Sequence, residues 1–111
     1  MPDPPQWIKA TVDRARRRAK KAMVPFDLTP EDLVALFNEQ EGNCYWFDVP
    51  LGVDPNRPYH PCTPSLDRVA PDLGYVPSNV VWACLAANVA KRDTEPDCWE
   101  DFLDLMRASL R

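Results

Sequence analysis

Residues 64–93, PSLDRVAPDLGYVPSNVVWACLAANVAKRD, form the stretch that decides the fold. Two short apolar runs flank a connection that contains Pro and Gly, and this pattern predicts two antiparallel strands near residues 65–69 and 79–83. The connection is too long for a tight hairpin turn. The next run, from about Cys84 to Lys91, predicts a short helix, so the stretch reads as strand, loop, strand and helix.

Polar side chains stand where these elements meet. Asp67 and Arg68 end the first apolar run, Asn79 precedes the second, and Asn88 lies in the helix. If the helix packs back across the hairpin, the carboxylate of Asp67 and the amide oxygen of Asn88 come together.

Chain length and composition indicate one small domain. The 111 residues are enough for one core and too few for two, and 45% of them are hydrophobic. Thirteen prolines against three glycines favour fixed loops over long regular elements. We expect the whole chain, 1–111, to form a single α+β domain in which helices dominate.

Two helices are predicted before the hairpin. The first spans residues 1–22 and stops before Pro25, and its apolar residues recur at helical spacing: Trp7, Ile8, Val12 and Ala15. The second falls within residues 26–42, where Thr29 is a good N-cap and Gly42 a good C-terminal stop.

The remaining segments are one more strand, a loop and a last helix. Cys44–Phe47 is short and aromatic and predicts a strand or an extended hairpin arm. Residues 48–64 hold five prolines and predict an irregular loop. These segments and the hairpin make up a core of residues 43–93. The last helix lies in residues 94–111, from about Pro96 to Leu110, with an apolar face of Trp99, Phe102, Leu103 and Met106.

The charge of the chain is unevenly spread. The net charge is −4, but residues 1–22 carry +5 and residues 23–111 carry −9. A basic end on an acidic body is typical of a polyanion-binding arm. The alternative, a solvated basic helix that docks on the acidic body of its own protein, stays open on charge alone.

The sequence predicts a soluble protein. No stretch approaches the ~20 apolar residues of a membrane span, and the N-terminus lacks the order of a signal peptide. We therefore expect an intracellular protein, in the cytoplasm of a bacterial or phage-infected cell, with its cysteines mostly reduced.

Four motifs in order resemble those of the HNH endonucleases, a ββα-metal superfamily: G-x-C, L-D-R, G-Y-x-x-x-N-V and C-x-x-x-N-x-x-K. The likeness is greater to a phage- and bacteria-associated branch whose hairpin begins S-L-D-R in place of Asp-His. The basic first helix and the segment F-D-L-T-x-E-D-L also resemble that branch, so the likeness covers roughly residues 14–92.

This resemblance implies a metal-dependent endonuclease that hydrolyses phosphodiester bonds in DNA. It implies that Asp67 and Asn88 are the ligands of Mg²⁺ or Mn²⁺ in a ββα-metal core. It also implies that Asn79 braces the hairpin loop through hydrogen bonds to the backbone, as asparagine side chains commonly do.

Arg68 departs from the pattern, because the position after the aspartate normally holds the histidine that activates water. Arginine stays protonated and cannot act as a base, but it can clamp the scissile phosphate. The single histidine, His60, is a candidate for the missing base if the proline-rich loop turns it back toward Asp67. A loop histidine without a catalytic role is the alternative that we favour.

The resemblance also bears on the cysteines. Cys44 and Cys84 fit two positions of the zinc site that many relatives carry, but Phe47 and Ala87 stand at the second position of each pair. Two ligands hold structural Zn²⁺ poorly, so we expect apolar packing there instead of zinc.

The basic residues of the first helix, with two residues after Asn88, are candidate contacts to DNA phosphates. They are Lys9, Arg14, Arg16, Arg17, Arg18, Lys20, Lys21, Lys91 and Arg92.

Two rival hypotheses remain. The missing histidine and the acidic body favour a catalytically inactive module that binds DNA or a protein. The short chain also permits a component of a larger assembly, such as a phage packaging or defence system, in which a protein partner supplies DNA affinity or a missing group.

Overall fold

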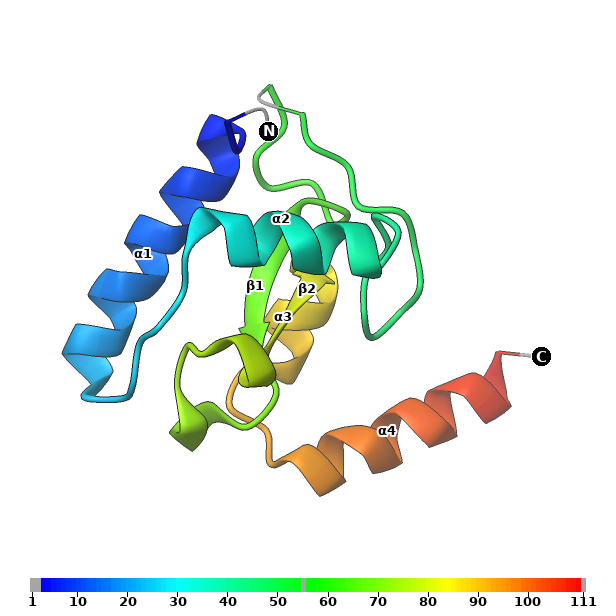
Figure 1. Cartoon of the computed structure of the whole chain (residues 1–111). Helices are drawn as coiled ribbons and strands as arrows, with labels where there is room; N and C mark the ends of the chain where they lie inside the picture. The colour runs from blue at the N-terminus through cyan, green and yellow to red at the C-terminus, as the bar shows by residue number, and fades with distance from the viewer. Residues whose placement is uncertain (1–2, 55, 111) are drawn as a thin grey trace.

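A computed structural model describes residues 3–54 and 56–110 of the chain. In this part, four α-helices surround a two-stranded antiparallel sheet (Figure 1). The elements are α1 (Gln6–Ala22), α2 (Pro30–Glu39), β1 (Pro64–Arg68), β2 (Val80–Cys84), α3 (Leu85–Lys91) and α4 (Pro96–Ser109). The predicted α+β class of a small, largely helical domain is confirmed.

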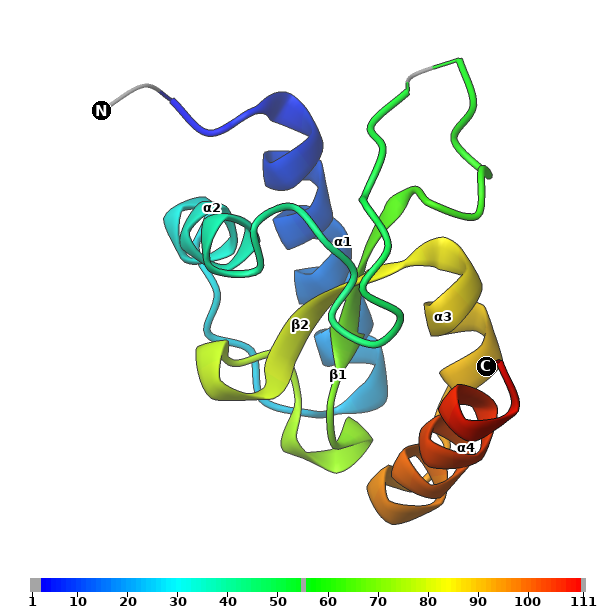
Figure 2. The ribbon, with the colours of Figure 1, turned by 90° about the vertical axis from the view of Figure 1, so that its right-hand side faces the viewer.

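The β1–β2 hairpin divides the molecule into two sides, with α1 and α2 on one and α3 and α4 on the other (Figure 2). Successive residues of a strand point to opposite faces, and β2 uses both. Val80 and Trp82 pack in the core with α1 and α2, whereas Val81 and Ala83 pack in the core with α3 and α4. Asp67 pairs with Val81 across the hairpin and so belongs to the α3 side.

The outer edge of β2 is closed by side-chain and loop contacts. The side-chain amide of Gln40 accepts a hydrogen bond from the Trp82 N–H at 2.9 Å and donates to the Trp82 carbonyl at 2.8 Å. The backbone N–H of Tyr45 also donates to that carbonyl, at 3.0 Å. These contacts satisfy backbone groups that an edge strand would leave open.

The second helix is shorter than the predicted segment 26–42. It begins after a capping box in which the N-cap Thr29 and Asp32 bond each other's backbone N–H groups. It ends at Glu39 in a Schellman motif, where the left-handed residue is Glu41 (φ 56°) and the following Gly42 also has a positive φ. The predicted N-cap is confirmed, and the predicted stop is one residue late.

The predicted strand at Cys44–Phe47 is wrong. This segment is a turn, closed by hydrogen bonds from the Cys44 N–H to the Val49 carbonyl at 2.8 Å and from the Asp48 N–H to the Cys44 carbonyl at 2.9 Å. The aromatic residues that suggested a strand serve packing instead, because the buried Trp46 ring meets the Trp99 ring edge-on at 5.9 Å.

In the two terminal helices, the residues of the predicted apolar faces are buried or partly buried, except for Phe102. Ile8, Val12 and Ala15 of α1 are buried, as expected. In α4, Trp99 and Leu103 are buried, but Phe102 was predicted to be buried and is 47% exposed. Its ring stacks on the outside of Trp99. Within the described residues, no helix has the length and apolar character to cross a membrane.

Gly74 fixes the loop between the strands against the α1–α2 connection. It has φ 77°, and a Cβ at this position would lie 2.3 Å from the carbonyl oxygen of Pro25. The neighbouring Tyr75 N–H donates to that same oxygen at 2.8 Å, and the Asp27 N–H donates to the Tyr75 carbonyl at 2.9 Å. Only glycine permits this close approach of two backbones.

Candidate functional site

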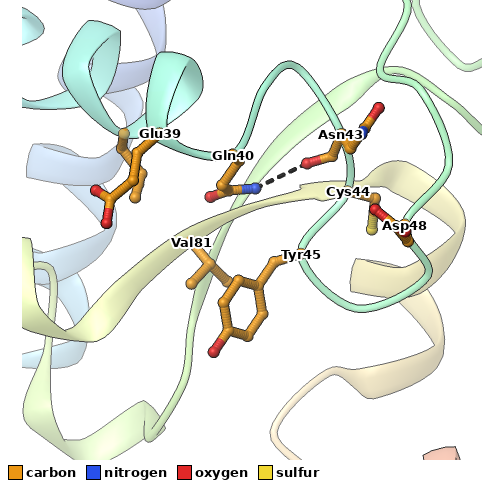
Figure 3. A pocket seen from close by; sticks show the side chains of 8 residues that line it. Glu39, Gln40, Asn43, Cys44, Tyr45, Asp48 and Val81 are labelled. Carbon is orange, nitrogen blue, oxygen red and sulfur yellow. Dashed lines mark hydrogen bonds between the residues drawn. The ribbon is translucent and has the colours of Figure 1, made fainter.

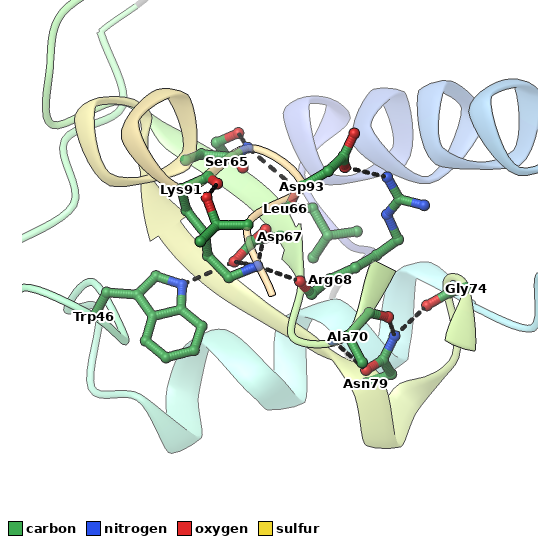
Figure 4. A network of polar contacts seen from close by, with 12 residues as sticks. Trp46, Ser65, Leu66, Asp67, Arg68, Ala70, Gly74, Asn79, Lys91 and Asp93 are labelled. Carbon is green, nitrogen blue, oxygen red and sulfur yellow. Dashed lines mark hydrogen bonds and ion pairs between the residues drawn. The ribbon is translucent and has the colours of Figure 1, made fainter. Parts of the chain in front are cut away.

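Asp67, a predicted metal ligand, lies on the α3 side of β1 and is 5% exposed. Its carboxylate has two partners (Figure 4). The indole Nε1 of Trp46 donates to Oδ2 at 2.8 Å, and the ammonium of Lys91 lies 3.3 Å from Oδ2 and 3.4 Å from Oδ1. The carboxylate is therefore held in a fixed orientation inside the protein.

These surroundings pull the protonation of Asp67 in opposite directions. Burial raises the pKa of the Asp67 carboxyl above its ordinary value, because a charge is poorly solvated inside the protein. The Lys91 ammonium and the Trp46 N–H both stabilise the ionised form and limit this rise in the pKa. Burial is the larger effect.

Lys91 was predicted to contact phosphate on the surface, but the structure buries its side chain completely. Its ammonium also donates to the backbone carbonyl of Arg68 at 2.8 Å and lies 5.7 Å from the centre of the Trp46 ring. A buried ammonium needs such partners to compensate for lost hydration. Lys91 is thus an internal counter-ion of Asp67 and does not face solvent.

Asn88, the second predicted ligand, stands one turn before Lys91 on α3. Its Nδ2 donates to the Ser65 hydroxyl oxygen at 2.5 Å, with a longer contact to the Leu66 carbonyl at 3.5 Å. These contacts direct the nitrogen of the amide toward β1. The other amide atom, Oδ1, is the one with lone pairs to offer a cation.

Asp67 and Asn88 line the same cavity, of about 160 Å³, although they are far apart in the sequence. Arginines from three different segments line it as well: Arg18 of α1, Arg68 of β1 and Arg92 after α3. Asp67 and Asp93 supply negative charge. The cavity thus combines two oxygen donors suited to a divalent cation with three guanidinium groups suited to phosphate.

Arg68 is positioned by neighbours on three sides. Its guanidinium donates to the Pro71 carbonyl at 3.0 Å and lies 5.0 Å from the centre of the Tyr75 ring. It also forms an ion pair with Asp93 at 3.5 Å, but the Asp93 side chain is 81% exposed and the pair is weak in water. These contacts leave the guanidinium at the cavity wall, where it can bind an anion.

Asn79 makes the loop contacts expected of it. Its amide accepts from the Ala70 N–H at 3.0 Å and donates to the carbonyls of Ala70 at 2.9 Å and Gly74 at 2.7 Å. One side chain thus ties both ends of the connection between β1 and β2, and it holds the loop that begins just after Arg68.

His60 is not among the residues that line the cavity at Asp67. Its Nδ1 accepts a hydrogen bond from the backbone N–H of Cys62 at 3.0 Å, and its backbone N–H and carbonyl bond to the adjacent loop residues Arg57 and Thr63. The structure therefore gives His60 a local role in the proline-rich loop and does not bring it to Asp67.

The cysteines are free thiols. Cys44 and Cys84 are buried, Cys62 is half-buried and Cys98 is exposed. Burial, with a smaller contribution from the Cys44 thiol, raises the pKa of Cys84 to about 11. Across residues 3–54 and 56–110, no group of three or more His, Cys, Asp or Glu side chains is placed to hold a metal ion.

The basic residues of α1 divide into two sets. Arg14 and Arg18 line cavities beside β1. Arg16 instead pairs with Asp13 at 2.9 Å and lies over the Phe26 ring. The other predicted phosphate contacts on α1 are outside these cavities: Lys9 is half-buried, and Arg17, Lys20 and Lys21 are exposed.

A different cavity, of about 300 Å³, lies at the end of α2 (Figure 3). Its ionisable residues include Glu39 and Asp48, and no Lys or Arg is among the residues that line it. Gln40 crosses it to donate to the Asn43 carbonyl at 2.9 Å. Its negative charge would repel a nucleic acid, so it does not extend the arginine-lined site.

Sequence reasoning missed the partners of Asp67. A signal for Lys91 was present, because Cys84, Ala87 and Lys91 recur at the three- and four-residue spacing of a buried helix face. Nothing in the sequence connects Trp46 to Asp67, since that contact depends on how the turn after α2 packs.

Comparisons of the chain with models of protein families, with curated proteins and with solved structures each found no match.

Proposed function

We propose that the protein is a metal-dependent endonuclease of the HNH type that hydrolyses phosphodiester bonds in DNA. One observation supports this most strongly. Two side chains that offer oxygen ligands, Asp67 and Asn88, line one cavity with three arginines. The order of strand, strand and helix that carries them agrees with the motifs that resemble this superfamily.

In this proposal, the residues of the chain divide into ligands and phosphate contacts. The Asp67 carboxylate and the Asn88 amide oxygen would hold Mg²⁺ or Mn²⁺, both of which take oxygen ligands. When bound, the ion neutralises charge on the phosphate and acidifies water. Arg68 contacts the scissile phosphate, where its fixed guanidinium stabilises the charge of the transition state.

Lys91 sets a condition on metal binding. The Lys91 ammonium contacts both carboxylate oxygens of Asp67 and would compete for them with a divalent cation. Lys91 retains its bond to the Arg68 carbonyl, so it has a partner if the carboxylate turns toward the cation. We therefore expect weak metal binding in the absence of DNA, because the phosphate would add ligands and charge.

A second candidate function is a module that binds DNA without cleaving it. The ion pair between Lys91 and Asp67 favours this alternative, because it neutralises the carboxylate without a metal. The lack of a histidine in the cavity favours it as well. Both functions use the same arginines, so binding alone does not distinguish them.

Cleavage of supercoiled plasmid DNA in Mg²⁺ or Mn²⁺ distinguishes the two functions. We expect the unaltered protein to cleave and Asn88→Ala to lose about 3 kcal/mol of transition-state stabilisation, or about 100-fold in rate. The DNA affinity of this variant, measured in EDTA, should remain within about threefold. Asn38→Ala, which alters an exposed asparagine of α2, is the matched control and should cleave normally.

The opposite outcomes are equally clear. If the unaltered protein binds DNA but cleaves none with either ion, while an HNH enzyme cuts under the same conditions, the binding module is correct. Equal cleavage by Asn88→Ala and Asn38→Ala would remove Asn88 from the site.

A further inference from the structure

A smaller cavity, of about 80 Å³, adjoins the cavity at Asp67. The two cavities share Arg18, Leu66 and Tyr75 in their walls. The smaller one is lined in addition by Arg14 and Thr11 of α1 and by Ser65 of β1. Its volume is several times the roughly 10–15 Å³ that one water molecule requires, so the cavity has room for part of a phosphate group.

The charge of this smaller cavity differs from that of its neighbour. Arg14 and Arg18 are its charged residues, and no Asp or Glu is among the residues that line it. The cavity at Asp67 contains Asp67 and Asp93 beside its arginines. The smaller cavity is therefore suited to an anion alone, without a cation to balance it.

The polar groups of the smaller cavity are oriented by their neighbours. Arg14 Nη2 donates to the Thr11 hydroxyl at 3.2 Å, which keeps the guanidinium against the helix surface. Ser65 accepts its bond from Asn88, and so its own hydroxyl proton remains to be donated. Two guanidinium groups and one hydroxyl thus supply donors from α1 and β1.

We propose that this smaller cavity binds the DNA backbone phosphate next to the one at Asp67, with Arg14, Arg18 and Ser65 as its contacts. Consecutive phosphates of one strand advance by only about 3.4 Å along the helix axis. A strand with one phosphate at Asp67 therefore places the next one close by. The proposal rests on the proposed function only for the presence of DNA in the first cavity.

The hydrogen bond between Ser65 and Asn88 links the two cavities. A phosphate bound to Ser65 holds the hydroxyl oxygen in place, and that oxygen holds the amide of Asn88. Binding in the smaller cavity therefore favours the orientation in which Asn88 offers its Oδ1 to the neighbouring cavity.

Three arginines of α1 allow a controlled test of this subsite. Arg14 and Arg18 lie one turn apart on the face toward β1, whereas Arg17 lies outside both cavities. All three are exposed enough to be replaced without loss of the fold. Arg14→Ala, Arg18→Ala and Arg17→Ala remove the same charge from the same helix, so any general effect of net charge is common to them.

Fluorescence anisotropy of a labelled short DNA, measured in EDTA over a series of NaCl concentrations, reports the number of phosphate contacts. We expect Arg14→Ala and Arg18→Ala each to weaken binding about tenfold and to reduce the slope of log K against log salt by about one. Arg17→Ala should leave the slope unchanged. Equal slopes for the three variants, or no DNA binding by the unaltered protein, would overturn the proposal.

The outcome is separable from that of the cleavage test. Reduced slopes for Arg14→Ala and Arg18→Ala in a protein that cuts no DNA support the subsite and contradict the nuclease. Normal cleavage with equal slopes supports the nuclease and contradicts the subsite.

Discussion

The ammonium of Lys91 lies 3.3 Å from Oδ2 of Asp67, and both side chains are buried. Helix α3 supplies the cation and β1 the anion, so the pair joins the helix to the hairpin. Removing one member of a buried pair leaves an uncompensated charge, which is costly, whereas replacing both by apolar residues often is not. The stability of the fold therefore depends on keeping both members of the pair together.

Lys91→Met should lower the free energy of unfolding by about 3–5 kcal/mol, because it leaves Asp67 buried without its counter-ion. The measurement is urea denaturation followed by circular dichroism. Lys20→Met, at an exposed position of α1, should change the same quantity by less than about 0.5 kcal/mol. The double variant Lys91→Met with Asp67→Leu should recover most of the loss. A double variant as unstable as Lys91→Met would contradict this account.

Asn79→Ala should lower the free energy of unfolding by about 1–3 kcal/mol, because it leaves the buried Gly74 carbonyl and the half-buried backbone groups of Ala70 without these partners. The loss is local, so the Ala70 amide should exchange its hydrogen faster in the variant. Hydrogen exchange followed by NMR checks this, with Asn38→Ala as the control. An unchanged exchange rate at Ala70 would show that Asn79 does not hold the loop.

Gly74→Ala should destabilise the protein by roughly 2–4 kcal/mol, since the new Cβ meets the Pro25 carbonyl oxygen and the positive φ is unfavourable for alanine. Gly52→Ala is a matched control, because a Cβ there has no neighbour within 4 Å and should change stability little. Thermal denaturation of both variants provides the comparison. Similar melting temperatures would mean that the two backbones do not approach so closely.

Cys84 should make the stability of the protein depend on alkaline pH. Burial raises the pKa of its thiol to about 11, whereas the thiol in an unfolded chain has a pKa of about 8.5. Between these values the unfolded state loses a proton that the folded state keeps. The contribution of the protonated Cys84 thiol to the free energy of unfolding is therefore fully present below about pH 8.5, and it is lost as the pH rises through 11.

Urea denaturation at pH 8 and pH 10.5 tests this dependence. The free energy of unfolding should fall less between the two pH values in Cys84→Ala than in the unaltered protein. An equal fall in both proteins would show that Cys84 does not cause the pH dependence.

Local signals predicted most of the fold. The helical spacing of Ile8 and Val12 predicted α1, and Thr29 as N-cap predicted the start of α2. The two short apolar runs on either side of the connection with Pro and Gly placed β1 and β2 within one residue of their observed bounds. These features depend on a few neighbouring residues, which a sequence shows directly.

The errors concern residues whose environment is set by distant parts of the chain. Cys44–Phe47 has the composition of a strand, but the outer edge of β2 is already bonded by Gln40, and the segment folds as a turn around Trp46. Lysine is normally a surface residue, but Lys91 is buried because Asp67 of β1 lies beside it as a counter-ion. The resemblance implied that Asp67 and Asn88 share a site, and both line one cavity. Their hydrogen bonds to Trp46 and Ser65 were not predicted.

The alternation of side chains along the hairpin makes its register depend on charge as well as on burial. A slip of one residue in β1 would turn Asp67 toward α1 and Arg68 toward α3. The Arg68 cation would then approach the buried Lys91 ammonium, and two like charges would meet where opposite charges now pair. Mispaired hairpins are thus penalised electrostatically, and the residues proposed for the site also help to select the native pairing.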